Sequence, residues 1–138
     1  APYLFDVHDI DLSQLNKDPA LATAIDALPG RKIVYTNGTA PYARQVLVAR
    51  GLDQVFDAVY GVEEANYLPK PELGAFETIF ALDGIHPRQA AMFEDEARNL
   101  KVPHSLGMQT VHVAPVPVKA PYLQHHTDDL RLFLEHLV

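Results

Sequence analysis

Polar side chains that could handle a phosphate group are found at three places in the sequence. Thr36 and Asn37 follow the run KIVY, Glu94 and Asp95 follow the run AAMF, and Lys70 lies between two prolines. Carboxylates are ligands that Mg²⁺ prefers, and a lysine in a loop restricted by proline can neutralise phosphoryl oxygens. The hydroxyl and amide groups can donate hydrogen bonds to the same oxygens. If these groups converge, the sequence predicts a magnesium-dependent pocket for phosphoryl transfer.

Strands and helices that alternate along the chain would have to position these groups. Apolar residues at helical spacing predict several helices, and the last of these begins with Thr127 as its N-cap. Short β-branched and aromatic runs predict strands between the helices. This alternation is typical of an α/β fold with a mostly parallel sheet, in which ligands bind at the carboxyl ends of the strands. The predicted helices are 18–28, 42–50, 71–84, 97–106 and 127–137, and the predicted strands are 32–38, 56–61, 90–96 and 109–113.

The composition limits the class of protein. A chain of 138 residues with 48% apolar residues can form one domain, 1–138, with a buried core. Its formal net charge of −7 disfavours nucleic acid polymers as partners. The absence of cysteine excludes disulfides and is compatible with the cytoplasm. No apolar run is long enough to cross a membrane, so we expect a cytoplasmic protein with no membrane partner, for which a homo-oligomer remains open.

Four segments together resemble one enzyme family. VYTNG, PKPELGAF, MFEDEARN and LGMQTVHV are similar to segments of the haloacid dehalogenase-like (HAD) hydrolases, in particular the branch that contains the pyrimidine 5′-nucleotidases. The resemblance runs from about residue 7 to the end of the chain. It implies a Rossmann-like core, a Mg²⁺ cofactor and the hydrolysis of phosphate monoesters, including nucleoside monophosphates. It also implies that Thr36, with Asn37 beside it, binds the transferring phosphoryl group, and that Lys70 stabilises the charge of the nucleophile and the phosphate.

The resemblance also assigns metal-binding roles. Asp95 would be a ligand of Mg²⁺, Glu94 would support it, and Asn99, one helical turn further on, would hold metal-bound waters or the loop. The implied function is a magnesium-dependent phosphomonoester hydrolase that acts on a small phosphorylated substrate through an aspartyl-phosphate. The alternative is a catalytically inactive binding module derived from such a hydrolase.

The nucleophile is not assigned by these motifs. The family uses the first aspartate of a D-x-D motif at the end of the central strand. In LFDVH, Asp6 follows an apolar run, but His8 stands where the family has an acid. In DIDLS, Asp9 and Asp11 have the required spacing, but the polar residues before them leave no clean buried strand. Neither register matches the motif fully, so the nucleophile stays unknown.

The opening residues are better explained as a connector. Too few residues separate them from Thr36 to form the cap that follows the nucleophile in the family, so residues 1–17 are predicted to lead from a missing cap back to the core. The sheet would then lack its central first strand, which would leave backbone groups unpaired. Residues 3–7 could fill the gap, another segment or chain could fill it, or the sheet could rearrange. On this hypothesis Asp9 and Asp11 lie away from the pocket.

Two other classes of site fit the sequence less well. A phospho-acceptor domain of the receiver type also uses acids, a threonine and a lysine, but its acids come first, whereas here the order is Thr36, Lys70, Asp95. The chain has seven histidines but no H-E-x-x-H motif, which disfavours a histidine metal site.

Overall fold

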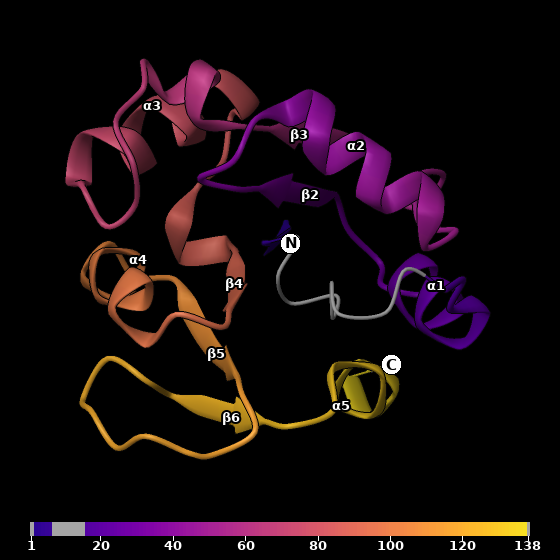
Figure 1. The fold of residues 1–138 in the computed structure, drawn as a ribbon. Helices are drawn as coiled ribbons and strands as arrows, with labels where there is room; N and C mark the ends of the chain where they lie inside the picture. Colours follow the sequence, from indigo (N-terminus) through magenta and orange to yellow (C-terminus); the bar gives the residue numbers. More distant parts are fainter. Residues whose placement is uncertain (1, 7–15, 138) are drawn as a thin grey trace.

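The protein is an α/β fold built on one parallel sheet. The computed structural model describes residues 2–6 and 16–137. Within them, six parallel strands form a sheet in the order β3-β2-β1-β4-β5-β6, with helices on both faces (Figure 1). The predicted fold class is therefore confirmed. The strands are β1 Tyr3–Phe5, β2 Lys32–Tyr35, β3 Ala58–Tyr60, β4 Ala91–Glu94, β5 Gln109–Val113 and β6 His125–Thr127.

The helices form two layers around this sheet. Figure 1 shows α1, α2 and α5 on one side of the sheet and α3 and α4 on the other, and the two buried apolar clusters follow the same division. The helices are α1 Pro19–Asp26, α2 Ala40–Ala49, α3 Leu73–Asp83, α4 Lys101–Ser105 and α5 Leu130–Leu137, with short 3₁₀ turns η2 Val62–Ala65, η3 Pro87–Gln89 and η4 Ala97–Leu100. None of the helices among the described residues is long and apolar enough to cross a membrane.

Local chemistry explains where several helices start and stop. The Asp18 carboxylate accepts a hydrogen bond from the Leu21 amide at 3.0 Å, which caps the start of α1. Gly84 ends α3 with a φ of 69°, a left-handed conformation that glycine adopts without steric cost. The helix predicted over 97–106 is divided, because η4 turns into α4 at Lys101.

The central strand position is filled by the opening residues, which is the first of the three alternatives that the sequence left open. β1 pairs with β2 on one side and with β4 on the other, both in parallel register. Leu4 and Phe5 are fully buried, and the Phe5 ring stacks on Phe93 with centroids 4.7 Å apart. Three residues are enough to pair both neighbours and fill the core, so residues 3–5 are part of the sheet. The other residues of the predicted connector include 7–15, which lie outside the described part of the chain.

The last helix starts later than predicted. Thr127 lies in β6, a strand that was not predicted, and α5 begins at Leu130. The carboxylate of Asp129 accepts a hydrogen bond from the Leu132 amide at 3.1 Å, so Asp129 caps the helix. The Thr127 hydroxyl instead bonds with the backbone of Asp129 at 2.9 and 3.0 Å. Thr127 and Asp129 both have side chains suited to caps, and pairing with β5 decides between them.

Candidate active site

A buried lysine joins the ends of two neighbouring strands. Lys70 Nζ lies 2.7 Å from Asp6 Oδ2 and 2.7 Å from Glu94 Oε2, and it also donates to the Tyr35 carbonyl at 3.2 Å. Asp6 directly follows β1, Glu94 is the last residue of β4, and Tyr35 is the last residue of β2. The lysine and both carboxylates are at most 3% exposed. The three ammonium donors therefore meet acceptors from three adjacent strand ends.

Burial and charge act against each other in this cluster. Burial lowers the pKa of Lys70, but the Glu94 and Asp6 carboxylates outweigh it and hold the pKa above its ordinary value. Burial raises the pKa of Glu94 to about 8, although Lys70 opposes the rise. Burial also raises the pKa of Tyr35 to about 12, and the Lys70 ammonium lies 4.9 Å from the centre of its ring. Lys70 is thus charged, and its charge is what makes two buried carboxylates tolerable.

Asn37 holds the backbone of the lysine loop. Its Oδ1 accepts a hydrogen bond from the Lys70 amide at 2.7 Å, and its Nδ2 donates to the Lys70 carbonyl at 3.2 Å. The Lys70–Pro71 peptide bond is cis. Because both ends of the amide group are engaged by the Lys70 backbone, Asn37 ties the loop after β2 to the loop that carries the lysine.

Thr36 lies in a turn that is braced from the next strand. The residue is buried, its amide donates to the Tyr60 carbonyl at 3.0 Å, and its Oγ1 accepts from the Gly38 amide at 3.1 Å. The carboxylate of Glu63 accepts from the Ala40 amide at 2.8 Å, where α2 begins. This bracing fixes the Thr36 hydroxyl at the same edge of the sheet as Asp6, because both residues directly follow paired strands.

The acids after β4 divide into a buried and an exposed one. Glu94 is turned inward, and its Oε1 accepts from Asn99 Nδ2 at 3.4 Å. Asp95 is exposed, and its backbone carbonyl accepts a hydrogen bond from His112 Nε2 at 2.9 Å. Asn99 Oδ1 is buried and has no hydrogen-bond partner among the described residues. The segment therefore presents one exposed carboxyl group, that of Asp95, next to the lysine cluster, and one buried oxygen, Asn99 Oδ1, without a partner among the described residues.

The oxygen donors at the site bear on whether it could hold the Mg²⁺ that the resemblance implies. No group of three or more histidine or acidic side chains that could hold a metal ion is found among the described residues. Mg²⁺ often keeps several waters and binds through one or two carboxylates and a substrate phosphate. Asp6 and Asp95 follow the paired strands β1 and β4. Asn99 Oδ1 has no hydrogen-bond partner among the described residues and could accept a bond from a metal-bound water. These hard oxygen donors fit an ion that is bound partly by water and substrate.

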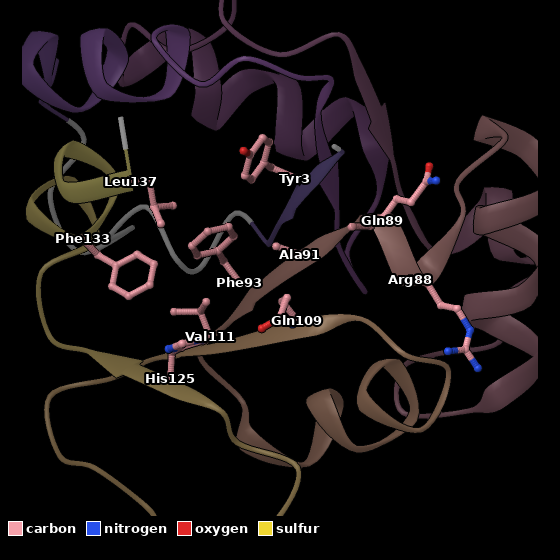
Figure 2. Close-up of a pocket in the computed structure, with 11 residues that line it drawn as sticks. Tyr3, Arg88, Gln89, Ala91, Phe93, Gln109, Val111, His125, Phe133 and Leu137 are labelled. Carbon is pink, nitrogen blue, oxygen red and sulfur yellow. The ribbon is translucent and has the colours of Figure 1, made fainter.

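A pocket of about 390 Å³ lies at the other edge of the sheet. Figure 2 shows that it is bordered by Tyr3, Ala91 and Gln109, which begin β1, β4 and β5, and by Phe133 and Leu137 of α5. Its lining is mostly apolar, and neither Lys70 nor its partners take part in it. The candidate active site is therefore distinct from this hollow.

The sequence-derived site residues largely converge. Thr36, Asn37, Lys70, Glu94, Asp95 and Asn99 all lie at or next to the carboxyl ends of the strands. Their contacts differ from expectation in two respects. Glu94 binds Lys70 directly, and the side-chain amide of Asn37 bonds to the Lys70 backbone. Asp9, Asp11 and His8 fall in the part of the chain that is not described, so their predicted distance from the pocket stays a prediction.

Asp6 is the site residue that the sequence analysis left unassigned. It was passed over because His8 stands two positions later. The signal for it was the apolar run YLF before the acid, which is the same pattern that placed Thr36 after KIVY and Glu94 after AMF. An apolar run that ends in a polar residue marks the carboxyl end of a buried strand, even when the run is only three residues long.

Comparison with known families identifies the class of protein. The family model of the haloacid dehalogenase-like hydrolases matches residues 19–113, which is well over half of the chain. The chain therefore belongs to the haloacid dehalogenase-like hydrolases. A search of curated proteins found no match.

Solved structures of this superfamily share the fold. A dehalogenase is similar with a TM-score of 0.75 and 20% identity, covering 88% of this chain and 56% of its own. A protein described as a predicted phosphoglycolate phosphatase from Haemophilus somnus 129pt has a TM-score of 0.68 and 21% identity, covering 87% and 55%. The L-2-haloacid dehalogenase from Xanthobacter autotrophicus with chloropropionic acid covalently bound has a TM-score of 0.59 and 22% identity, covering 70% and 39%. The chain thus spans 39–56% of the length of these proteins.

Proposed function

We propose that the protein is a magnesium-dependent phosphomonoester hydrolase in which Asp6 is the nucleophile. The observation that carries the proposal is the Asp6–Lys70 ion pair of 2.7 Å at the end of the central strand. A carboxylate acts as a nucleophile through its oxygen, and the Lys70 ammonium beside it can offset negative charge as the phosphoryl group arrives. Membership of a hydrolase family whose members use an aspartate at this point of the sheet supports the same assignment.

The site residues divide the work of the reaction. A carboxylate oxygen of Asp6 attacks the phosphorus, the ester oxygen leaves as the alcohol after taking up a proton, and water then hydrolyses the aspartyl-phosphate. Lys70 offsets negative charge on Asp6 and on the phosphoryl oxygens throughout. The Thr36 hydroxyl is placed to donate to the phosphoryl group, and Asn37 keeps the lysine loop in position. Positioned charge of this kind supplies most of the acceleration in phosphoryl transfer.

The charge balance supports a divalent cation as cofactor. The acidic side chains of Asp6 and Asp95 outnumber the one ammonium of Lys70 even when Glu94, whose pKa burial raises to about 8, carries a proton, so the site by itself would repel a phosphate dianion. Asp6 and Asp95 would hold the ion, with Asn99 on its bound waters or on the turn. When bound, Mg²⁺ supplies charge neutralisation and polarisation of the phosphoryl oxygens.

This surplus of acids also favours phosphate over haloacid substrates. A haloacid is a monoanion, whereas a phosphate monoester is a dianion, so a cation that offsets charge benefits the phosphate ester more. Nucleoside monophosphates are the proposed substrates, because the segments VYTNG and PKPELGAF resemble the pyrimidine 5′-nucleotidase branch. A cytoplasmic location is part of the same proposal.

A phosphatase assay with pyrimidine nucleoside monophosphates tests the proposal. We expect turnover with Mg²⁺ that is lost on chelation and that falls by at least about a thousandfold in Asp6→Asn and Asp95→Ala. Asp26→Asn, at an exposed position of α1, is the matched control and should retain full activity. Release of halide from 2-chloropropionate without phosphatase activity would identify a dehalogenase. Neither activity in the folded protein would favour the inactive binding module.

A further inference from the structure

A buried histidine bonds to the backbone of the exposed site acid. His112 lies on β5 opposite Glu94 of β4, is 3% exposed, and approaches the Asp95 carbonyl with Nε2 at 2.9 Å. A carbonyl only accepts, so Nε2 must carry the proton. Nδ1 is buried and has no hydrogen-bond partner among the residues that the structure describes. The ring therefore makes a single directed hydrogen bond, and that bond ends on Asp95.

Two hydrogen bonds hold the peptide unit between Asp95 and Glu96. The Glu96 amide donates to Glu94 Oε1 at 3.4 Å, and the shorter bond from His112 holds the carbonyl side. The 3₁₀ turn η4 begins at Ala97, and its N-cap residue, Glu96, makes no capping hydrogen bond with its side chain. Glu94 is held through its carboxylate by Asn99 and Lys70. Asp95 itself is exposed, so the direction of its side chain depends on the orientation of its backbone and on a hydrogen bond with the neighbouring Glu94 carboxyl group. The hydrogen bond from His112 to the Asp95 carbonyl therefore restrains the backbone from which the Asp95 side chain projects.

We propose that His112 is a positioning residue that holds the Asp95 carboxylate toward the cation of the proposed hydrolase. The inference rests on the proposed function for the role of Asp95, but the orienting bond itself is a feature of the fold. Groups that orient a metal ligand without touching the metal commonly contribute tenfold to a hundredfold to metal affinity. His112 would act in this way from the neighbouring strand.

The neighbouring strand offers a matched control. His126 pairs with His112 in the register of β5 and β6, and its Nε2 donates to the Ala114 carbonyl at 2.8 Å. The centroids of the His112 and His126 rings are 5.9 Å apart. The chemistry of the two bonds is the same, but Ala114 carries no functional side chain. A loss specific to His112 therefore reports on Asp95 and not on a general loss of histidine bonds.

Gln and Met substitutions separate the hydrogen bond from the packing. Gln can place an N–H near the position of Nε2, whereas Met has a similar length and volume without a donor. We expect His112→Met to weaken Mg²⁺ binding about tenfold or more by isothermal titration calorimetry. Without metal, amide hydrogen exchange over residues 95–99 should become about fivefold faster. His112→Gln should restore both values toward wild type, and His126→Met should leave both unchanged.

Two outcomes would overturn the inference. In the first, His112→Met has the same amide hydrogen exchange rates and Mg²⁺ affinity as wild type. In the second, His126→Met changes the exchange rates and the Mg²⁺ affinity as much as His112→Met does. If the wild-type protein binds no Mg²⁺, the metal-dependent function fails, and the positioning of Asp95 is then decided by the exchange data alone. If His112→Met does not fold, His112→Asn replaces it, because the shorter amide places no donor at the position of Nε2. Unchanged exchange in that variant would also overturn the inference.

Discussion

The two edges of the sheet differ in what they bury. At the carboxyl edge, one lysine and two acids with almost no exposure fill the space between the strand ends. At the amino edge, aromatic and aliphatic side chains surround a pocket of about 390 Å³. The ion pair toward that edge, between Arg31 and Asp83, leaves the arginine side chain 46% exposed. Charge is concentrated where the strands end, and open space is found where they begin.

This difference shows that the volume of a pocket does not locate the candidate active site in this fold. Parallel strands bring residues that follow them to one edge, so side chains from distant parts of the chain meet there. Buried charges persist only when each has a partner, and such a cluster leaves little empty volume. The carboxyl edge should therefore be sensitive to single changes, whereas the amino edge should tolerate them.

Removing the charge of Lys70 should have the largest effect on stability. Lys70→Met leaves Asp6 and Glu94 buried and facing each other without a cation, and we expect a loss of about 3–5 kcal/mol in the free energy of unfolding. Urea denaturation at neutral pH measures this loss. Lys101→Met, at an exposed position of α4, is the control and should stay within about 0.5 kcal/mol of wild type. A similar cost for both variants would show that the buried cluster does not depend on its lysine.

The substitution Gly61→Ala, which adds one methyl group, should lower the free energy of unfolding by about 1–3 kcal/mol. The new Cβ would overlap the Glu63 carboxylate and the Ala40 amide, and it would lie 2.8 Å from the Gly38 carbonyl. The hydrogen bond that braces the turn after Thr36 would be lost. Thermal or urea unfolding of Gly61→Ala measures the cost. Gly74→Ala is the control, because its Cβ meets only the movable Leu68 side chain at 3.2 Å and alanine favours a helix.

The ion pair toward the amino edge should contribute about 1–2 kcal/mol, and only above acidic pH. Arg31 donates to both Asp83 oxygens at 2.8 Å, and Tyr60 donates at 2.6 Å. The Arg31 bonds hold the pKa of Asp83 below its ordinary value. This stability is therefore present above about pH 4, near the unfolded pKa, and is lost as the pH falls through the folded pKa.

The substitution Asp83→Asn checks this sign. The difference in unfolding free energy from wild type should be largest near pH 7 and should shrink toward pH 2. Added salt should reduce it, since the arginine is half exposed. A difference that stays constant over this pH range would contradict the assignment of the ion pair.

Filling the pocket should have the smallest effect. Ala91→Val adds two methyl groups to a half-buried residue that lines it, and we expect a change of about 0.5 kcal/mol or less. Ala75→Val, at a fully buried position of α3, is the comparison and should cost about 1–3 kcal/mol through overpacking. Equal costs for the two variants would mean that the amino edge is as tightly packed as the core.

Much of the fold and of the site could be predicted from the sequence. Helical spacing located α1, α2 and α3, and the runs KIVY, AAMF and QTVHV located three strands. The rule that polar residues follow buried strands then placed Thr36 and Asp95 at one edge, whereas Lys70 was assigned from its proline-flanked loop and from the family resemblance. These predictions succeeded because they rest on local periodicity and on the geometry of parallel sheets.

The remaining features depend on contacts that a sequence does not display. β1 has three residues, and it is a strand because β2 and β4 pair with it from both sides. β6 contains two adjacent histidines and is formed by pairing with β5. Asp6 was left unassigned because the residue two positions later differs from the family motif. Its contact with Lys70 spans 64 residues of the chain, a separation over which no local pattern could have revealed it.

The central claim is that Asp6 accepts the phosphoryl group, and direct localisation of the covalent intermediate tests it. The protein is incubated with Mg²⁺ and a phosphate monoester, quenched in acid and reduced with borohydride, which converts an aspartyl-phosphate to homoserine. Peptide mass spectrometry then locates the modified residue. The proposal predicts homoserine at position 6 and none in Asp6→Asn. Modification at Asp9 or Asp11, or turnover without modification at position 6, would contradict it.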